Sequence, residues 1–377
     1  MYPDEHPTAG GTRPWFSFGL IDRKEAALAL LNVVSILLVY APFLDRLSLI
    51  TRYWDGPMYM YVAATLYSIP ADSPLHVLNL PDYYYACHLA LFPLMIRLFS
   101  FALGYEWAML FVVAACSSLA TVYFYRLLKE FNLSVNPFMV SAFFVFFPSR
   151  WLLYHSVGAT EPLFVLLVIA SLYYYKRESY LAAFVLAGLA SVTRIFGILM
   201  LVSYVITLVY QKKYRHIPLT FIIPLFLGLN FAVYWAVYHD PLAYFRYNGG
   251  FMEAVPFLMF FENAARGATN NAELFFAFYV LFLLGTLRLR RHQEIFVFTA
   301  VYVLACAFVM HPDVSRYLLP AAPFALLVAF DEVIARKEFL LVFPLVVVFG
   351  YCYCWGILPT NLMGTDLYDR MMQAIGR

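Results

Sequence analysis

The residue best suited to chemistry is Asp55, an acid just past the first hydrophobic stretch. It follows Tyr53-Trp54 and precedes Gly56-Pro57. A carboxylate here can act as a general base, taking the proton of a hydroxyl group while its oxygen attacks a sugar carbon. Asp55 is also a good helix N-cap, because Pro57 costs little in a first helical turn. The two roles are compatible, since a cap fixes the direction of the carboxylate.

Three more charged residues lie in turns between apolar segments. Glu161 is predicted to bind an acceptor or, alternatively, a divalent cation, although acids are also common at helix N-termini. Arg194 and Arg316 are predicted to hold a lipid phosphate, because a guanidinium binds phosphate in a bidentate manner and stabilises a leaving phosphate. The alternatives are that Arg194 only snorkels to the membrane interface and that Arg316 only pairs with Asp313.

Aromatic and imidazole side chains nearby are candidates for binding an acceptor or a sugar: Trp54, Tyr85, His88 and His155. The alternative is that these side chains belong to the membrane interface, where such residues are enriched. The five cysteines have no zinc or redox spacing. The cysteines therefore give no indication of a zinc or redox centre.

The elements that position these residues must be membrane helices. Of the 377 residues, 63% are hydrophobic and 13% are charged, about half the charged content of soluble domains. Four stretches reach or approach the ~20 apolar residues that cross a bilayer; they are 26–44, 108–128, 219–238 and 339–357. The net charge of +2 gives no indication of nucleic-acid binding. We predict an all-α polytopic membrane protein with a retained first span and a single domain over residues 1–377.

Basic clusters predict the topology, because cytoplasmic loops collect Lys and Arg. The clusters are Arg126/Lys129, Lys176/Arg177, Lys212/Lys213/Arg215, Arg288/Arg290/Arg291 and Arg336/Lys337. Placing them inside gives about eleven spans, with segment 88–103 as an interfacial helix. Loops 45–106 and 238–270 and the tail 357–377 then lie outside. The four charged site candidates are expected on this outer face, where they should line one cavity.

The distribution of charge favours an enzyme over a transporter. Ion-coupled carriers usually keep ionisable residues in mid-span and have paired inverted halves. Here the predicted mid-span positions are nearly free of such residues, and the two halves do not match. A lipid-linked sugar transporter or flippase remains the alternative from another class.

The order of these features resembles the GT-C glycosyltransferases, which have a first span, a long outer loop with a catalytic acid near its start, interfacial helices and many further spans. Short elements resemble the PIG-V-like mannosyltransferases, which are similar to the enzymes that add the second mannose of glycosylphosphatidylinositol anchors. These elements are Trp54-Asp55 with Tyr59, HLALFPL (88–94), TEPLF (160–164) and ASVTRIFG (190–197). Pro162 and Ile195-Phe196 depart from the family pattern, so the acceptor stays open.

The resemblance implies an inverting glycosyltransferase with Asp55 as the base and with Arg316 and Arg194 at the donor phosphate. It also implies no metal ligand and no cofactor, with a divalent metal as the less favoured alternative. The expected donor is a polyprenyl-phosphate hexose, in the first instance mannose on dolichyl or a similar phosphate. The expected acceptor is a lipid or glycan at the outer or lumenal face. Transfer of a pentose or aminosugar is the alternative within the same fold. The compact chain resembles prokaryotic relatives, which favours a plasma membrane over the alternative, an endoplasmic-reticulum membrane.

Overall fold

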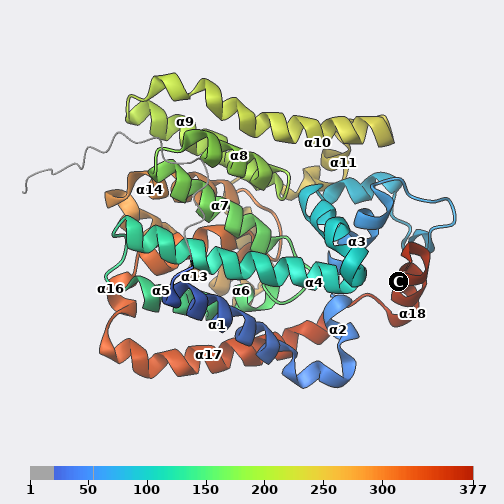
Figure 1. Cartoon of the computed structure of the whole chain (residues 1–377), viewed down its shortest axis with the longest axis horizontal. Helices are drawn as coiled ribbons and strands as arrows, with labels where there is room; N and C mark the ends of the chain where they lie inside the picture. The colour runs from blue at the N-terminus through green and yellow to red at the C-terminus, as the bar shows by residue number, and fades with distance from the viewer. Residues whose placement is uncertain (1–20, 54, 377) are drawn as a thin grey trace, which may run out of the picture.

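The computed structural model describes residues 21–53 and 55–376. The regular structure of these residues is helical, apart from two isolated β-bridges. The α-helices are α1 (Arg23–Tyr40), α2 (Ser48–Thr51), α3 (Asp55–Thr65), α4 (Leu91–Glu130), α5 (Pro137–Phe146), α6 (Ser149–Tyr154), α7 (Glu161–Lys176), α8 (Tyr180–Ser191), α9 (Leu199–Tyr210), α10 (Ile222–Tyr238), α11 (Ala243–Asn248), α12 (Leu258–Ala265), α13 (Thr269–Arg288), α14 (Gln293–Cys306), α15 (Val314–Leu318), α16 (Asp331–Ile334), α17 (Lys337–Ile357) and α18 (Thr365–Ile375). Figure 1 shows the long helices packed side by side as a bundle.

Five helical stretches of the described chain are long and apolar enough to cross a membrane: Arg23–Arg46, Leu91–Glu130, Tyr214–Tyr238, Thr269–Arg291 and Lys337–Thr360. Shorter apolar helices, such as α8 and α14, lie among them. The chain is therefore an all-α membrane protein, and the count of eleven spans stays a prediction. Some predicted crossings are divided in the structure, because prolines remove helix hydrogen bonds. After α15, for example, a 3-10 turn and a π-helix begin next to Pro320 and Pro323.

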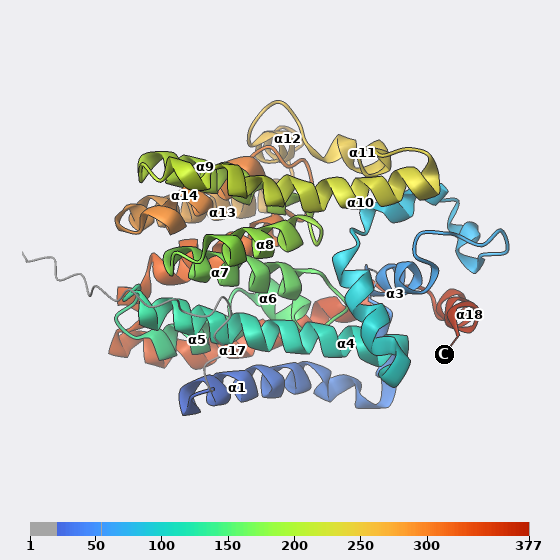
Figure 2. The ribbon, with the colours of Figure 1, turned by 45° about the horizontal axis from the view of Figure 1, so that its top comes forward.

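Helix α4 joins the predicted interfacial segment to the span that follows it. Gly104, with φ of +74°, has a non-helical conformation and separates the helix into two limbs. Figure 2 shows the first limb turned away from the second. Arg97 of the first limb donates hydrogen bonds of 2.8 Å to the carbonyls of Ala63 and Ala64, where α3 ends. The first limb thus holds the short helix that begins with Asp55.

The basic clusters gather at one end of the bundle, on the left in Figure 1 near α16. Ion pairs between the ends of different helices demonstrate this grouping. The pairs are Arg126–Glu25, Lys129–Asp22, Lys176–Glu294, Arg177–Glu130, Lys213–Glu178 and Arg291–Asp331. We call this region the basic end.

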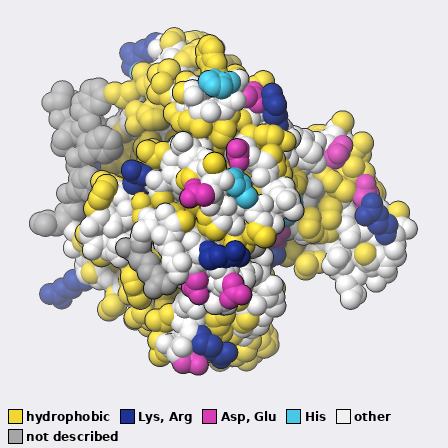
Figure 3. Space-filling view, turned by 90° about the vertical axis from the view of Figure 1, so that its right-hand side faces the viewer, with side chains coloured by type: hydrophobic (Ala, Val, Ile, Leu, Met, Phe, Trp, Pro, Cys, Tyr) yellow, Lys and Arg dark blue, Asp and Glu magenta, His cyan; other side chains and the backbone are white. Residues whose placement is uncertain are grey.

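The opposite end, which we call the loop end, is built from the two long predicted loops and the tail. Loop 45–106 forms α2, α3, two 3-10 helices and the first limb of α4. Loop 238–270 contributes α11 and α12, and the tail contributes α18. Figure 3 faces this end and shows acidic, basic and histidine side chains among hydrophobic ones. The buried helix α7 runs between the two ends, with Glu161 at its start and Lys176 at its finish.

Candidate active site

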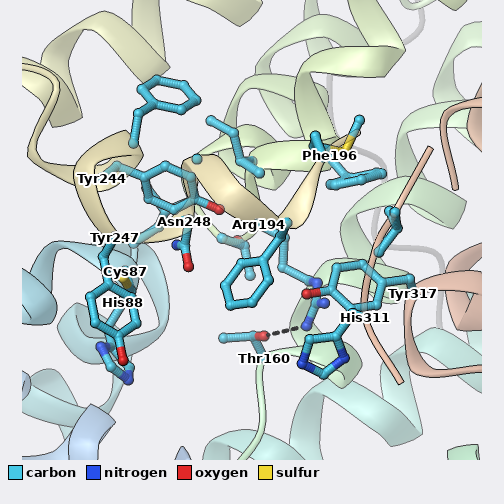
Figure 4. A pocket seen from close by; sticks show the side chains of 18 of the residues that line it. Cys87, His88, Thr160, Arg194, Phe196, Tyr244, Tyr247, Asn248, His311 and Tyr317 are labelled. Atoms are coloured by element: carbon cyan, nitrogen blue, oxygen red, sulfur yellow. Dashed lines mark hydrogen bonds between the residues drawn. The ribbon is translucent and has the colours of Figure 1, made fainter. Parts of the chain in front are cut away.

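A cavity of about 690 Å³ lies at the loop end, and several sequence-predicted residues line it. Asp55, His88, Arg194 and Arg316 are among the lining residues. They come from four separate parts of the chain: the start of α3, the segment before α4, the turn after α8, and α15. Figure 4 shows His88, Cys87 and Tyr247 on one side of this cavity and Arg194, His311 and Tyr317 on the other. The helical packing therefore brings the predicted base and both predicted phosphate ligands to one space.

Asp55 begins α3 and is held in place by a close approach of two glycines. A Cβ atom on Gly158 would lie 2.7 Å from the Cα of Gly56, and it would also meet the Sδ of Met109. Any larger residue at position 158 would therefore push α3 outward. The Asp55 carboxylate is about a quarter exposed and forms an ion pair through Oδ2 with Nη2 of Arg316.

Arg316 binds both acids of the site. Besides its ion pair with Asp55, its Nε donates to Oε1 of Glu161 at 2.5 Å. Its guanidinium also lies 4.5 Å from the centre of the Tyr154 ring, a cation–π contact. The alternative partner weighed from the sequence, Asp313, is instead bound by Arg150 and by the Tyr154 hydroxyl.

Arg194 lies in the turn between α8 and α9 and faces the start of α7. Its Nη1 donates to Oε1 of Glu161 at 2.5 Å and to the Thr160 hydroxyl at 3.2 Å. Its guanidinium lies 5.9 Å from the centre of the Tyr317 ring. A side chain that only snorkels to the membrane interface would not need these contacts. The contacts and the place of Arg194 on the cavity wall therefore favour a role in the site.

Glu161 joins the two arginines from behind the cavity wall. Its side chain has no exposed surface and is not among the lining residues, so it does not contact the space where an acceptor would lie. One oxygen, Oε1, accepts from both arginines, and Oε2 has no hydrogen-bond partner within the described residues. A buried carboxylate is tolerated only when cations compensate it. The geometry thus places Glu161 as the anchor of Arg194 and Arg316, whereas the sequence had predicted acceptor binding.

The two predicted histidines differ in position. His88 lines the cavity and contacts the rings of Tyr59 and Tyr84 edge-on, with centroids 4.8 Å and 5.5 Å away. Burial lowers the pKa of His88 to about 4, so the imidazole is neutral near pH 7. His155 is fully buried beside Trp151, away from the cavity, and neither ring nitrogen has a partner within the described residues. The predicted sugar-binding role therefore fits the position of His88 and does not fit that of His155.

In the run of tyrosines 83–85, the residue that lines the cavity is Tyr84, one position before the predicted Tyr85. Tyr85 is buried against Tyr61, whereas Tyr84 lines the cavity and contacts Tyr247 edge-on at 4.8 Å. The run of three tyrosines forms a 3-10 helix, Asp82–Cys87, whose successive side chains point in different directions. The sequence predicted Tyr85, whereas its neighbour Tyr84 faces the cavity. Trp54 lies outside the described residues.

Other lining residues were missed from the sequence because their loops carry no motif. Tyr247 and Asn248 come from α11 in the predicted loop 238–270, whose length was the one available signal. An apolar part of the wall follows Arg194 directly and includes Ile195, Ile198 and Leu199. The cavity thus combines a charged wall, an aromatic and amide wall, and an apolar wall.

The acids of this site bind arginines, and a ligand set for a metal ion is not formed around them. Among the described residues, no group of three or more His, Cys, Asp or Glu side chains could hold a metal ion. The arginines are the cationic groups that this cavity offers to an anionic ligand. Comparison with protein-family models and with curated proteins finds no match for the chain.

Proposed function

We propose that this protein is an inverting membrane glycosyltransferase that uses a polyprenyl- or dolichyl-phosphate sugar, with mannose as the expected hexose. The acceptor is a lipid or glycan at the outer face. The observation that supports this proposal is the juxtaposition of one carboxylate and two arginines on the wall of a single 690 Å³ cavity. This is the pairing of base and phosphate ligand that such a transfer requires.

In the proposed reaction, Asp55 accepts the proton of the acceptor hydroxyl while that oxygen attacks the anomeric carbon of the donor sugar. The bond between this carbon and the phosphate oxygen breaks, and polyprenyl phosphate leaves with one additional negative charge. Arg316 and Arg194 stabilise that charge, as cationic donors do in other phosphate sites. Attack opposite the leaving phosphate inverts the anomeric configuration.

The ion pair between Asp55 and Arg316 suggests how the base becomes available. Arg316 is bound to Asp55 and Glu161 together. When a donor phosphate attracts the guanidinium, Glu161 remains as its partner, so the buried cation is never left without one. Donor binding would thus release Asp55 for the acceptor, which predicts that donor binds before acceptor.

The remaining walls suit the other parts of such a donor. Tyr84, Tyr247 and Asn248 offer ring faces and an amide, groups that bind sugar rings and hydroxyls. Ile195, Ile198 and Leu199 offer apolar surface next to Arg194, where the first isoprene units attached to the phosphate can pack.

The test is transfer from radiolabelled polyprenyl-phosphate mannose by the purified protein in lipid nanodiscs, with total lipid extract of the host as acceptor. We expect a labelled product whose formation falls about 10²- to 10⁴-fold in Asp55→Asn, because the general base is lost. Asp72→Asn, which alters an exposed acid of the same loop, is the control and should keep full activity.

Unchanged turnover in Asp55→Asn would contradict the proposed base. If the wild type makes no product from this donor, donors carrying a pentose or aminosugar are tested next. Movement of intact labelled lipid across a vesicle membrane without transfer would instead support a lipid-linked sugar transporter.

A further inference from the structure

The segment 361–375 is bound to the stretch of chain that leads into Asp55. The backbone N–H of Met363 donates to the carbonyl of Arg52 at 2.9 Å. Tyr53 and Leu362 form an isolated antiparallel bridge. Residues more than 300 positions apart are therefore joined through their backbones two to three residues before the predicted base.

Side chains reinforce this attachment. Nη1 of Arg52 donates to the hydroxyl of Thr365, the first residue of α18. The Tyr368 hydroxyl lies 2.9 Å from the Thr51 hydroxyl and donates to Glu106 at 2.6 Å. Arg52 and Tyr368 are buried, whereas Thr365 is exposed, so loss of a partner would leave a buried donor unsatisfied.

Helix α18 is amphipathic, and its apolar side is used to cover the loop end. Met363, Tyr368, Met371 and Met372 are buried, whereas Asp369 on the opposite side is exposed. Figures 1 and 2 show α18 beside α3, the helix that begins with Asp55. A surface helix of this kind is stabilised by burying one face, so α18 and α3 fix each other's position.

The attachment also reaches the arginine side of the site. The Tyr53 ring meets the Tyr154 ring edge-on at 6.2 Å, and Arg316 lies over that same Tyr154 ring. Residues 361–375 themselves do not line the cavity within the described part of the chain. Their influence on the site therefore passes through segment 51–53 and through the packing of α18 against α3.

We propose that segment 361–375, through Thr365 and Tyr368, is a positioning element that sets the direction of Asp55 and its distance from Arg316. Its catalytic consequence rests on the proposed transferase function. The physical reason is that a base must hold its position closely, since a displacement of about 1 Å can cost about 10²-fold in rate. Segment 51–53 is also held by the hydrogen bond from the Thr51 hydroxyl to Glu106 and by the contact between the Tyr53 and Tyr154 rings, and the attachment adds the backbone and α18 contacts to these.

The experiment compares Thr365→Val, Thr365→Ser and Tyr368→Phe with Asp369→Asn, an exposed control on the same helix. Transfer kinetics and hydrogen exchange of residues 51–60 are measured on the full chain in nanodiscs. We expect kcat to fall about 10-fold in Thr365→Val and Tyr368→Phe, with donor KM within about two-fold, because the arginines are untouched. Exchange in 51–60 should quicken in both variants. Thr365→Ser, which keeps the hydroxyl, should restore both properties.

Exchange separates this proposal from the proposed function, because it does not depend on any substrate. If the wild type transfers no sugar, faster exchange in Thr365→Val still supports the positioning role, and the transferase proposal fails alone. Unchanged exchange and unchanged kcat in both variants would overturn the positioning proposal. A parallel loss of kcat and donor affinity would also overturn it, since that pattern indicates general damage to the cavity. If Tyr368→Phe does not fold, the comparison of Thr365→Val with Thr365→Ser tests the positioning proposal alone.

Discussion

The two ends of the bundle use the same ion-pair chemistry for different purposes. At the basic end, Arg126 binds both oxygens of Glu25, at 2.8 and 2.9 Å, and each group has one main partner. At the loop end, Arg194 and Arg316 share a single oxygen of Glu161, and Arg316 also reaches Asp55. The shared arrangement lies beside a cavity of about 690 Å³.

The difference shows how one type of contact can be structural or poised for a ligand. The one-to-one pair between Arg126 of α4 and Glu25 of α1 holds the two helices together, and each charged group already has its partner. A guanidinium that has two carboxylate partners can exchange one of them for a phosphate and remain neutralised by the other. The loop end differs from the basic end in two ways: its ion pairs lie beside a cavity, and its arginines share one carboxylate.

Among the variants that compare the two ends, the largest expected effect on transfer comes from replacing matched arginines by lysine. Arg316→Lys should lower transfer about 100-fold, because an ammonium cannot reproduce the fork that reaches Asp55, Glu161 and a donor phosphate. Arg126→Lys at the basic end should keep transfer within about two-fold and lower only the melting temperature. Steady-state transfer and thermal unfolding in nanodiscs measure the two effects. Equal losses of transfer in both variants would remove the distinction between the ends.

Replacing matched glutamates by glutamine should have an intermediate effect. Glu161→Gln removes the charge that neutralises both arginines, so we expect about 10-fold weaker transfer and a clear loss of stability. Glu294→Gln, at the basic end, keeps one of the two oxygens that accept from Lys176 and Gln211, lies far from the cavity and should leave transfer unchanged. Binding of polyprenyl phosphate, measured beside transfer, reports on the arginines directly. Normal phosphate affinity in Glu161→Gln would show that the arginines need no anchor.

The last comparison of the two ends concerns acid sensitivity, with a change in stability and no change in transfer expected at pH 7. Burial lowers the pKa of His88 to about 4, below the value of about 6.5 in an unfolded chain. As the pH falls from about 6.5 to 4, the unfolded state binds the proton first, so His88 lowers stability over this range by up to about 3 kcal/mol. At the basic end, Lys213 lowers the pKa of Glu178, so stability there is lost only below about pH 4.5.

Melting temperatures at pH 7 and pH 5 test this contrast. His88→Phe keeps the ring contacts with Tyr59 and Tyr84 and should melt with a smaller pH dependence than the wild type. Val77→Ala, which alters an exposed residue of the same loop and adds or removes no titratable group, should leave the pH dependence unchanged. A wild-type protein that melts at the same temperature at both pH values would contradict the assignment.

Much of the site was accessible from charge alone. The basic clusters placed the turns bearing Asp55, Arg194 and Arg316 on one face, and the structure places all three side chains on one cavity. The reason is that each helix ends at a defined side of the bundle, so alternation of turns groups them. The charge pattern did not predict which residue within a turn faces the cavity. Tyr84 faces it where Tyr85 was predicted, and His155 lies in the core.

The sequence by itself determined the class of the protein, its helical content and which turns share an end, because hydropathy and charge are properties of short stretches. Only the tertiary structure decided that Arg316 binds Asp55 and Glu161, that Asp313 belongs to Arg150, and that the last helix supports the first loop. These choices depend on distances between segments far apart in the chain. Such distances follow from how the helices pack against one another, which no local pattern encodes.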